Sequence, residues 1–70
     1  MDLSQLNLVI EYLINNVELP IQYKNHYLIG DYYGYLECHL DYDWLLIYSI
    51  DYETKIIYLA RTGTHSDLFE

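Results

Sequence analysis

The run Trp44-Leu45-Leu46-Ile47-Tyr48-Ser49-Ile50 is the stretch of sequence that decides the fold. It is the densest apolar segment of the chain, and its length suits a buried β-strand. A second run, Lys55-Ile56-Ile57-Tyr58-Leu59-Ala60-Arg61, is rich in the β-branched and aromatic residues that strands favour. Between the two runs lies Asp51-Tyr52-Glu53-Thr54. This arrangement predicts a β-hairpin with a turn of about four residues.

A further strand is expected upstream of this hairpin. Residues 33–40 are rich in aromatic side chains and partly alternate between apolar and polar types, which is typical of a strand. A short gap, Asp41-Tyr42-Asp43, separates this segment from Trp44. A parallel crossover needs about a dozen residues, so the gap favours an antiparallel connection. The chain is therefore predicted to form a three-stranded antiparallel β-meander.

The N-terminal part of the chain has the spacing of an amphipathic helix. Apolar residues recur there at intervals of three and four, at Leu3, Leu6, Val9, Ile10, Leu13, Ile14 and Val17. We expect a helix from about residue 3 to about residue 16, a connecting loop at residues 19–31, and a short turn or helix at residues 62–69. The predicted fold class is α+β, a single two-layer domain over residues 1–70 in which the N-terminal helix packs on one face of the meander.

Composition and cysteine usage narrow the class of protein. Hydrophobic residues make up 53% of the chain, which favours a packed domain over a disordered tail. Cys38 is the single cysteine, so an internal disulfide is impossible and a reducing compartment is expected. The longest uninterrupted apolar run, from Trp44 to Tyr48, is far too short to span a bilayer. We therefore expect a cytoplasmic protein.

The charge balance is unusual for a protein that binds nucleic acid. The formal net charge is −8, and the fully cationic side chains are Lys24, Lys55 and Arg61. Proteins that neutralise several phosphates usually present a basic face. Such a face would have to be assembled here from very few cations together with protonated histidines.

Two separated segments nevertheless carry the side chains that metal-free cleavage of a phosphodiester needs. They are Glu37-Cys38-His39-Leu40-Asp41-Tyr42-Asp43-Trp44 and Arg61-Thr62-Gly63-Thr64-His65-Ser66-Asp67-Leu68-Phe69. Such cleavage requires a proton acceptor, a proton donor and a fixed positive charge. In the predicted meander, His39 and Asp43 flank the first turn, and Arg61 ends the strand that runs back towards Trp44. Because His65 follows closely, the two segments should meet at one end of the sheet, and ribonuclease chemistry is the leading hypothesis.

Other uses of these residues are less well supported. Cys38 and the histidines lack the tight spacing of structural zinc sites, so we expect neither a metal nor another cofactor. A cysteine nucleophile is not expected, because Cys38 and His39 are adjacent in a strand and should point to opposite faces. A buried structural histidine is the alternative for His39 and His65, and a loop histidine without a function is the alternative for His26.

An ordered set of short motifs also runs through residues 23–69. Its parts are Lys24-Asn25-His26, Leu28-Ile29-Gly30, Gly34-Tyr35, Glu37-Cys38-His39, Asp43-Trp44-Leu45-Leu46-Ile47-Tyr48, Arg61-Thr62-Gly63-Thr64-His65 and Leu68-Phe69. Each part is weak alone, whereas the ordered set is specific. In this order it resembles the YafQ branch of the RelE superfamily, toxins of bacterial toxin–antitoxin pairs that cut messenger RNA on the ribosome.

The resemblance implies roles for eight residues. The implied catalytic residues are His26, His39, Asp43, Arg61 and His65, and the implied substrate-binding residues are Lys24, Trp44 and Phe69. In this interpretation Arg61 stabilises the phosphorane-like charge and His65 protonates the leaving 5′-oxygen. The group that takes the proton from the 2′-hydroxyl, Asp43 or His39, is left open.

The resemblance also implies partners. A cognate antitoxin is expected, with the ribosome and messenger RNA as the place of action. Relatives usually begin with a strand and a longer helical hairpin, so this chain is expected to lack the first strand of a RelE-like sheet. An open sheet edge would then favour a homodimer or a complex with antitoxin. A non-catalytic, shortened toxin-like module that binds an antitoxin or self-associates is the alternative function.

Overall fold

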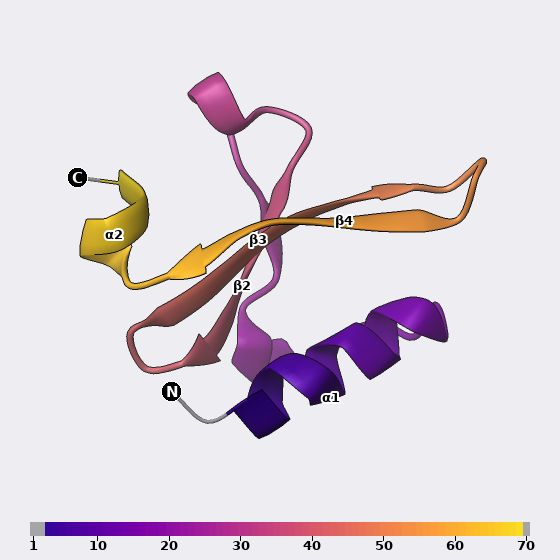
Figure 1. Cartoon of the computed structure of the whole chain (residues 1–70), viewed down its shortest axis with the longest axis horizontal. Coiled ribbons are helices and arrows are strands. Elements are labelled where there is room, and N and C mark those ends of the chain that lie inside the picture. Colours follow the sequence, from indigo (N-terminus) through magenta and orange to yellow (C-terminus); the bar gives the residue numbers. More distant parts are fainter. Residues whose placement is uncertain (1–2, 70) are drawn as a thin grey trace.

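The apolar run of the predicted hairpin forms the central strand of the computed structural model, which describes residues 3–69. The elements in chain order are α1 (Leu3–Ile14), the 3-10 turn η1 (Ile21–Tyr23), β1 (His26–Tyr27), the 3-10 turn η2 (Gly30–Tyr32), β2 (Leu36–Asp41), β3 (Trp44–Asp51), β4 (Ile56–Gly63) and α2 (His65–Phe69). Figure 1 shows α1 alongside the sheet, the β3–β4 hairpin as a long arm, and α2 at the end of β4. The predicted α+β class with an N-terminal helix and an antiparallel sheet is confirmed.

The sheet contains one strand more than predicted. Within the described residues its order is β1-β2-β3-β4, and each neighbouring pair is antiparallel. The prediction of a three-stranded meander is therefore wrong, because β1 lies within residues 19–31, the predicted connecting loop. This strand places His26 opposite Glu37 and Tyr27 opposite Leu36. Two residues cannot show a periodicity of their own, so the pairing with β2 is what defines β1.

Two other boundaries differ from the prediction for reasons that lie in the backbone. The helix α1 ends at Ile14, and Asn16 then takes a left-handed φ of 54°, a conformation typical of residues just after a helix. The strand β2 begins at Leu36 rather than at residue 33. Gly34 has a φ of 93° and lies in the turn that precedes β2, so residues 33–35 do not continue the strand.

The two faces of the sheet carry separate buried clusters. The cluster that faces α1 consists of Val9, Leu19, Tyr23, Leu36, Cys38, Leu40, Leu46 and Tyr48. The cluster on the other face consists of Leu45, Ile47 and Leu68, and Leu68 belongs to α2. Full burial of one large aliphatic side chain stabilises a fold by about 1.5–3 kcal/mol, so these clusters hold both helices on the sheet. Within residues 3–69, no helix has the length and apolar character needed to cross a membrane.

A partly buried hydrogen bond fixes the segment that leads into β1. The Tyr48 hydroxyl donates to Oδ1 of Asn25 over 2.6 Å. Burial, as the largest cause, raises the pKa of Tyr48, so the phenol stays protonated and remains a donor. Since Asn25 directly precedes His26, the central strand positions the first of the predicted site residues.

Candidate active site

One row of paired residues crosses the sheet from β1 to β4. His26 lies opposite Glu37, Glu37 lies opposite Ile47, and Ile47 lies opposite Arg61. Residues directly opposite each other in antiparallel strands point to the same face. His26, Glu37 and Arg61 therefore share the face on which Ile47 packs against α2. His39 follows Glu37 by two positions in β2 and points to the same face.

Glu37 is the buried centre of this row. It is 5% exposed, and its Oε1 lies 3.6 Å from Nε2 of His26 and 3.7 Å from Nε2 of His39. These distances are longer than an ordinary hydrogen bond, so the interaction is mainly electrostatic. The charge of Glu37 raises the pKa of His39 and so favours the protonated form of that ring. Glu37 is not among the predicted site residues, although its spacing of two from His39 in a predicted strand indicates that the two side chains share a face.

The ring of His26 is oriented by the backbone. Its Nδ1 lies 2.7 Å from the carbonyl oxygen of Lys24. A carbonyl oxygen can only accept, so Nδ1 carries the hydrogen and Nε2 faces Glu37. Lys24 reaches this position with a left-handed φ of 49° at the end of η1. The His26 side chain is half exposed, so a substrate can approach it.

His39 lies between the other two histidines. Its ring centroid is 6.4 Å from that of His26 and 5.8 Å from that of His65. Burial lowers the pKa of His39 below its usual 6.5, and the charge of Glu37 opposes this shift, while the charges of Lys24, His65 and His26 act with burial. The His39 ring is therefore mostly neutral at pH 7 and can accept a proton.

Asp43 anchors His65. Nδ1 of His65 donates to Oδ1 of Asp43 over 2.7 Å, and this hydrogen bond is the largest cause that lowers the pKa of Asp43. The start of α2 is held by a reciprocal cap, in which Asp67 N–H donates to Thr64 Oγ1 over 3.2 Å and Thr64 N–H donates to Asp67 Oδ2 over 3.1 Å. With Nδ1 engaged by Asp43, Nε2 is the ring nitrogen that can meet a substrate.

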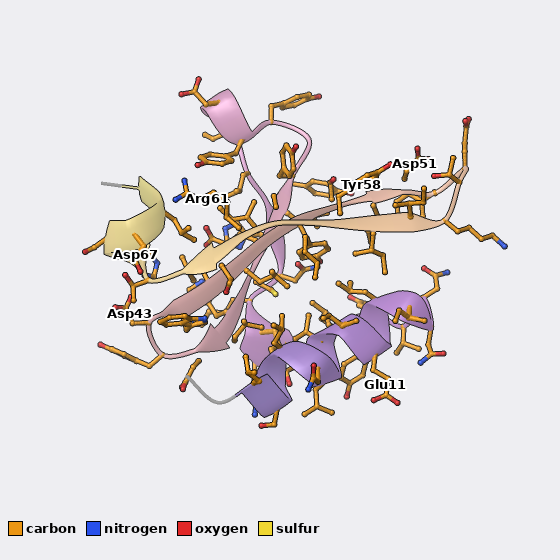
Figure 2. All side chains as sticks on the ribbon, viewed as in Figure 1. Glu11, Asp43, Asp51, Tyr58, Arg61 and Asp67 are labelled. Carbon is orange, nitrogen blue, oxygen red and sulfur yellow. The ribbon has the colours of Figure 1, made fainter. Side chains whose placement is uncertain are left out.

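Arg61 lies at the same end of the molecule. Figure 2 shows it beside α2, close to Asp67. Its Nη2 donates to the backbone carbonyl of Asp67 over 3.1 Å, and its Nη1 donates to the hydroxyl of Tyr32 over 3.4 Å. Both acceptors are uncharged, and a guanidinium has five N–H donors. Arg61 is thus held in place while part of its donor set remains for an anion.

The other predicted residues have different positions. Lys24 is exposed at the end of η1. Trp44 begins β3 and packs half-buried against the α1-facing cluster, and within the described chain its indole Nε1 is buried without a hydrogen-bond partner. Phe69 ends α2, and its side chain lies outside the part that the structure describes. Cys38 is fully buried on the opposite face, where burial raises the pKa of its thiol to about 12 and makes it a poor nucleophile.

The cluster also contains donor types that metals accept. Glu37, His39 and His65 each offer one ligand atom, and these atoms lie within 4.8 Å of one another. Imidazole nitrogen and carboxylate oxygen are ligands of Zn²⁺ in proteins. The sequence spacing does not indicate this set, because His65 comes from a different element. The same imidazoles are also suited to acid–base chemistry without a metal.

Known proteins are similar to this chain in sequence and in fold over nearly its whole length. Residues 1–70 match the model of the YafQ toxin family, described as bacterial toxins of type II toxin–antitoxin systems. The chain is 42% identical over 69 residues to the mRNA interferase toxin YafQ of Escherichia coli strain K12. This match covers 97% of this chain and 73% of the relative. It is similar to the crystal structure of the E. coli DinJ–YafQ complex, with a TM-score of 0.87, 39% identity, and coverage of 100% of this chain and 77% of that one. The crystal structure of a metal-bound toxin from Helicobacter pylori is also similar, with a TM-score of 0.89, 39% identity, and coverage of 99% and 77%.

Proposed function

The chain belongs to the YafQ family of type II bacterial toxins, and from this membership and its site we propose that it is an mRNA interferase, an endoribonuclease that cuts messenger RNA. The observation that carries the proposal is the row of three imidazoles, His26, His39 and His65, with ring centroids 6.4 and 5.8 Å apart. Neighbouring imidazoles supply a proton acceptor and a proton donor on either side of one phosphate. Arg61 on the same face supplies a fixed positive charge.

We assign His39 as the general base. It takes the proton of the ribose 2′-hydroxyl, and the 2′-oxygen then attacks the neighbouring phosphorus. Its lowered pKa keeps the ring available as an acceptor at neutral pH. The carboxylate of Glu37, 3.7 Å from Nε2 of His39, stabilises the imidazolium that forms. Asp43, the alternative base, already accepts a hydrogen bond from His65, and its lowered pKa makes it the weaker base.

We assign His65 as the general acid. When the bond between phosphorus and the 5′-oxygen breaks, Nε2 of His65 gives a proton to the leaving oxygen. The products are a 2′,3′-cyclic phosphate and a 5′-hydroxyl. Asp43 acts by holding Nδ1–H and so directing Nε2 outward. The remaining donors of Arg61 stabilise the extra negative charge on the phosphate as it becomes five-coordinate.

The charge of the chain bears on where the reaction takes place. The net charge is −8, and Lys55 lies in the β3–β4 turn, so Lys24 and Arg61 are the two cations near the histidines. So few cations bind free RNA weakly, because affinity grows with the number of neutralised phosphates. We therefore propose that the ribosome holds and presents the message, and that the chain itself contributes the catalytic groups.

The exposed edge of the sheet supports a protein partner. β4 pairs on one side with β3, and Ile56, Tyr58 and Leu59 on it are 44, 50 and 49% exposed. Unpaired apolar edges recruit other chains. We propose that an antitoxin segment covers this strand and reaches the surface near Arg61 and His65. A relative forms a DinJ–YafQ complex, and sedimentation of the isolated chain separates this proposal from a homodimer through the same edge.

The proposed activity is tested by induced expression in bacteria. Growth should stop, messenger RNA should be cut within translated regions, and a co-expressed antitoxin should restore growth. His65→Ala should abolish both effects at equal protein level. The matched control is Ser66→Ala, an exposed neighbour on α2 that takes no part in the proposed chemistry. Arrest by His65→Ala equal to that of the parent would refute catalysis through this site.

The net charge favours a second candidate, the non-catalytic module that binds an antitoxin without cutting RNA. It predicts a tight complex with antitoxin, measured by calorimetry, together with intact messenger RNA and normal growth of cells that express the parent chain. Cleavage by the parent chain excludes this candidate.

A further inference from the structure

A polar groove adjoins the histidine row at the outer edge of β2. The strand β1 covers Leu36 and Glu37 only, so the rest of this edge faces η1 instead of a strand. Between them lies a groove of about 380 Å³ whose lining includes Gln5, Gln22, Lys24, His39, Asp41 and Tyr42. Its volume is within the range of small-ligand sites. Because His39 is part of the lining, any group bound in the groove lies next to the proposed reaction centre.

The rim of this η1–β2 groove carries an aromatic platform. Tyr42 is 96% exposed, at the turn between β2 and β3. The carboxylate of Asp41 accepts the backbone N–H of Tyr42 over 2.8 Å, which stabilises the turn. A single exposed tyrosine is ordinary on a protein surface. Tyr42, however, lies on the rim of a groove that ends at His39, where its flat ring can stack on an unpaired RNA base.

The groove also offers hydrogen-bonding groups suited to a base edge. The Tyr23 hydroxyl donates to Oε1 of Gln5 over 2.9 Å, which fixes the Gln5 amide so that Nε2 is its remaining donor group. Gln22 is exposed in η1 and has both a donor and an acceptor in its amide. RNA bases expose donors and acceptors side by side on their edges, and side-chain amides match that pattern.

Lys24 and Arg61 lie on opposite sides of the histidines, where both can contact the RNA backbone. Lys24 lies on the groove side of the histidines, and Arg61 lies two strands away from Glu37 on the other side. His39, the proposed base, lies beside the groove, while His65, the proposed acid, lies beyond His39. The nucleotide that carries the attacking 2′-hydroxyl therefore falls on the groove side.

We propose that the η1–β2 groove binds the base of the nucleotide immediately 5′ to the cut, with Tyr42 stacking on the base and Gln5 and Gln22 contacting its edge. This inference rests on the proposed function, since it places the scissile phosphate beside His39. It makes the groove a specificity site for the base at this position. Lys24 contacts a backbone phosphate of the same nucleotide.

The test uses binding that does not require cleavage. Short 2′-O-methyl RNA tetranucleotides, one for each base, cannot be cut because the attacking hydroxyl is blocked. They are titrated into the ¹⁵N-labelled full chain, and two-dimensional NMR spectra are recorded. The backbone amides of Gln22, Lys24 and Tyr42 and the side-chain amides of Gln5 and Gln22 should shift, with different affinities for the four bases.

Variants at the rim separate stacking from general effects. Tyr42→Ala should weaken binding about 10-fold, in line with loss of one base–aromatic stack, and Tyr42→Phe should restore it. Tyr52→Ala is the matched control, because this exposed tyrosine lies in the turn at the other end of β3. Equal binding by Tyr42→Ala and the parent, shifts confined to residues around Arg61 and His65, or no binding at millimolar oligonucleotide would overturn the inference.

The same experiment distinguishes the groove from the proposed activity. If the parent cuts messenger RNA in cells and the groove signals do not move, the groove inference fails and the activity stands. If the groove binds the oligonucleotides and the parent cuts nothing, the activity fails and base binding stands. In a cutting parent, Tyr42→Ala should also reduce the base preference at the nucleotide 5′ to the cut when cleavage sites are sequenced.

Discussion

Nδ1 of His65 lies 2.7 Å from Oδ1 of Asp43, which joins the start of α2 to the β2–β3 turn across 22 positions of the sequence. The contact determines which ring nitrogen of His65 is available, because a carboxylate accepts the hydrogen of Nδ1. It also places the His65 ring next to His39, with centroids 5.8 Å apart. The position of the proposed acid is therefore set by a residue far away in the chain.

Asp43 and His65 should act as one unit in catalysis. We expect His65→Ala to reduce the rate of cleavage on programmed ribosomes by about 10²-fold or more, the usual contribution of a positioned acid. Asp43→Ala should reduce it by less, because the ring remains but loses its orientation. The double variant should be no slower than His65→Ala alone. Losses that multiply in the double variant would mean that Asp43 acts independently of His65.

The rate of cleavage should depend on pH through His39. Burial lowers the pKa of His39 below 6.5, so the neutral, basic form dominates at pH 7 and is lost as the pH falls through that lowered pKa. The rate should fall along with it. Glu37 raises the pKa of His39, so Glu37→Gln should move this acidic limb to lower pH. Single-turnover rates against pH measure the limb, with the exposed Glu53→Gln as control. A limb that stays in place in Glu37→Gln would contradict the electrostatic contact.

The same shift has a consequence for stability. A histidine with a lower pKa in the folded than in the unfolded state binds fewer protons when folded. Its contribution to the free energy of unfolding is therefore complete above about pH 6.5 and is lost as the pH falls through the folded pKa. Urea denaturation of the parent and of His39→Gln at several pH values should show a smaller dependence on pH in the variant. Identical pH profiles would show that His39 does not supply this dependence.

Arg61 should not tolerate lysine. Its guanidinium donates to the carbonyl of Asp67 and the hydroxyl of Tyr32 from separate nitrogens, and a single ammonium cannot keep both contacts and also meet a phosphate. We expect Arg61→Lys to reduce cleavage about 10-fold or more. Lys55→Ala, which removes a cation from the β3–β4 turn, is the control. Full activity of Arg61→Lys would mean that only diffuse charge is needed.

The bond between Tyr48 and Asn25 should stabilise the fold measurably. Tyr48→Phe removes the donor of a partly buried hydrogen bond whose acceptor, Asn25, is exposed, so it costs about 1 kcal/mol of unfolding free energy. In a domain of this size such a loss lowers the melting temperature by about 4–8 °C per kcal/mol. Thermal unfolding measures the change, and Tyr52→Phe at an exposed position should have almost no effect. A melting temperature equal to that of the parent would show that the hydrogen bond adds no net stability.

Much of the architecture follows from local patterns in the sequence. In the N-terminal helix, apolar residues recur at intervals of three and four because one face of the helix is buried. The run from Trp44 is continuously apolar, which is the pattern of a buried strand. The short gap before Trp44 requires the antiparallel connection that the structure has. The same topology predicts that His39, Asp43 and His65 meet, and their contacts in the structure agree.

The features that only the tertiary structure reveals are those that leave no periodic pattern of residues in the sequence. The strand β1 is two residues long, and only its pairing with β2 makes it a strand. The burial of Glu37 depends on the segments that cover β2. The lowered pKa of His39 depends on the burial of its own ring and on the charges of Lys24, His65 and His26, which come from three other segments. The sequence by itself determined the helix, the hairpin and the identity of most of the proposed site residues. The tertiary structure alone decided the fourth strand, the central place of Glu37 and the orientation of His65, because these result from contacts between residues far apart in the chain.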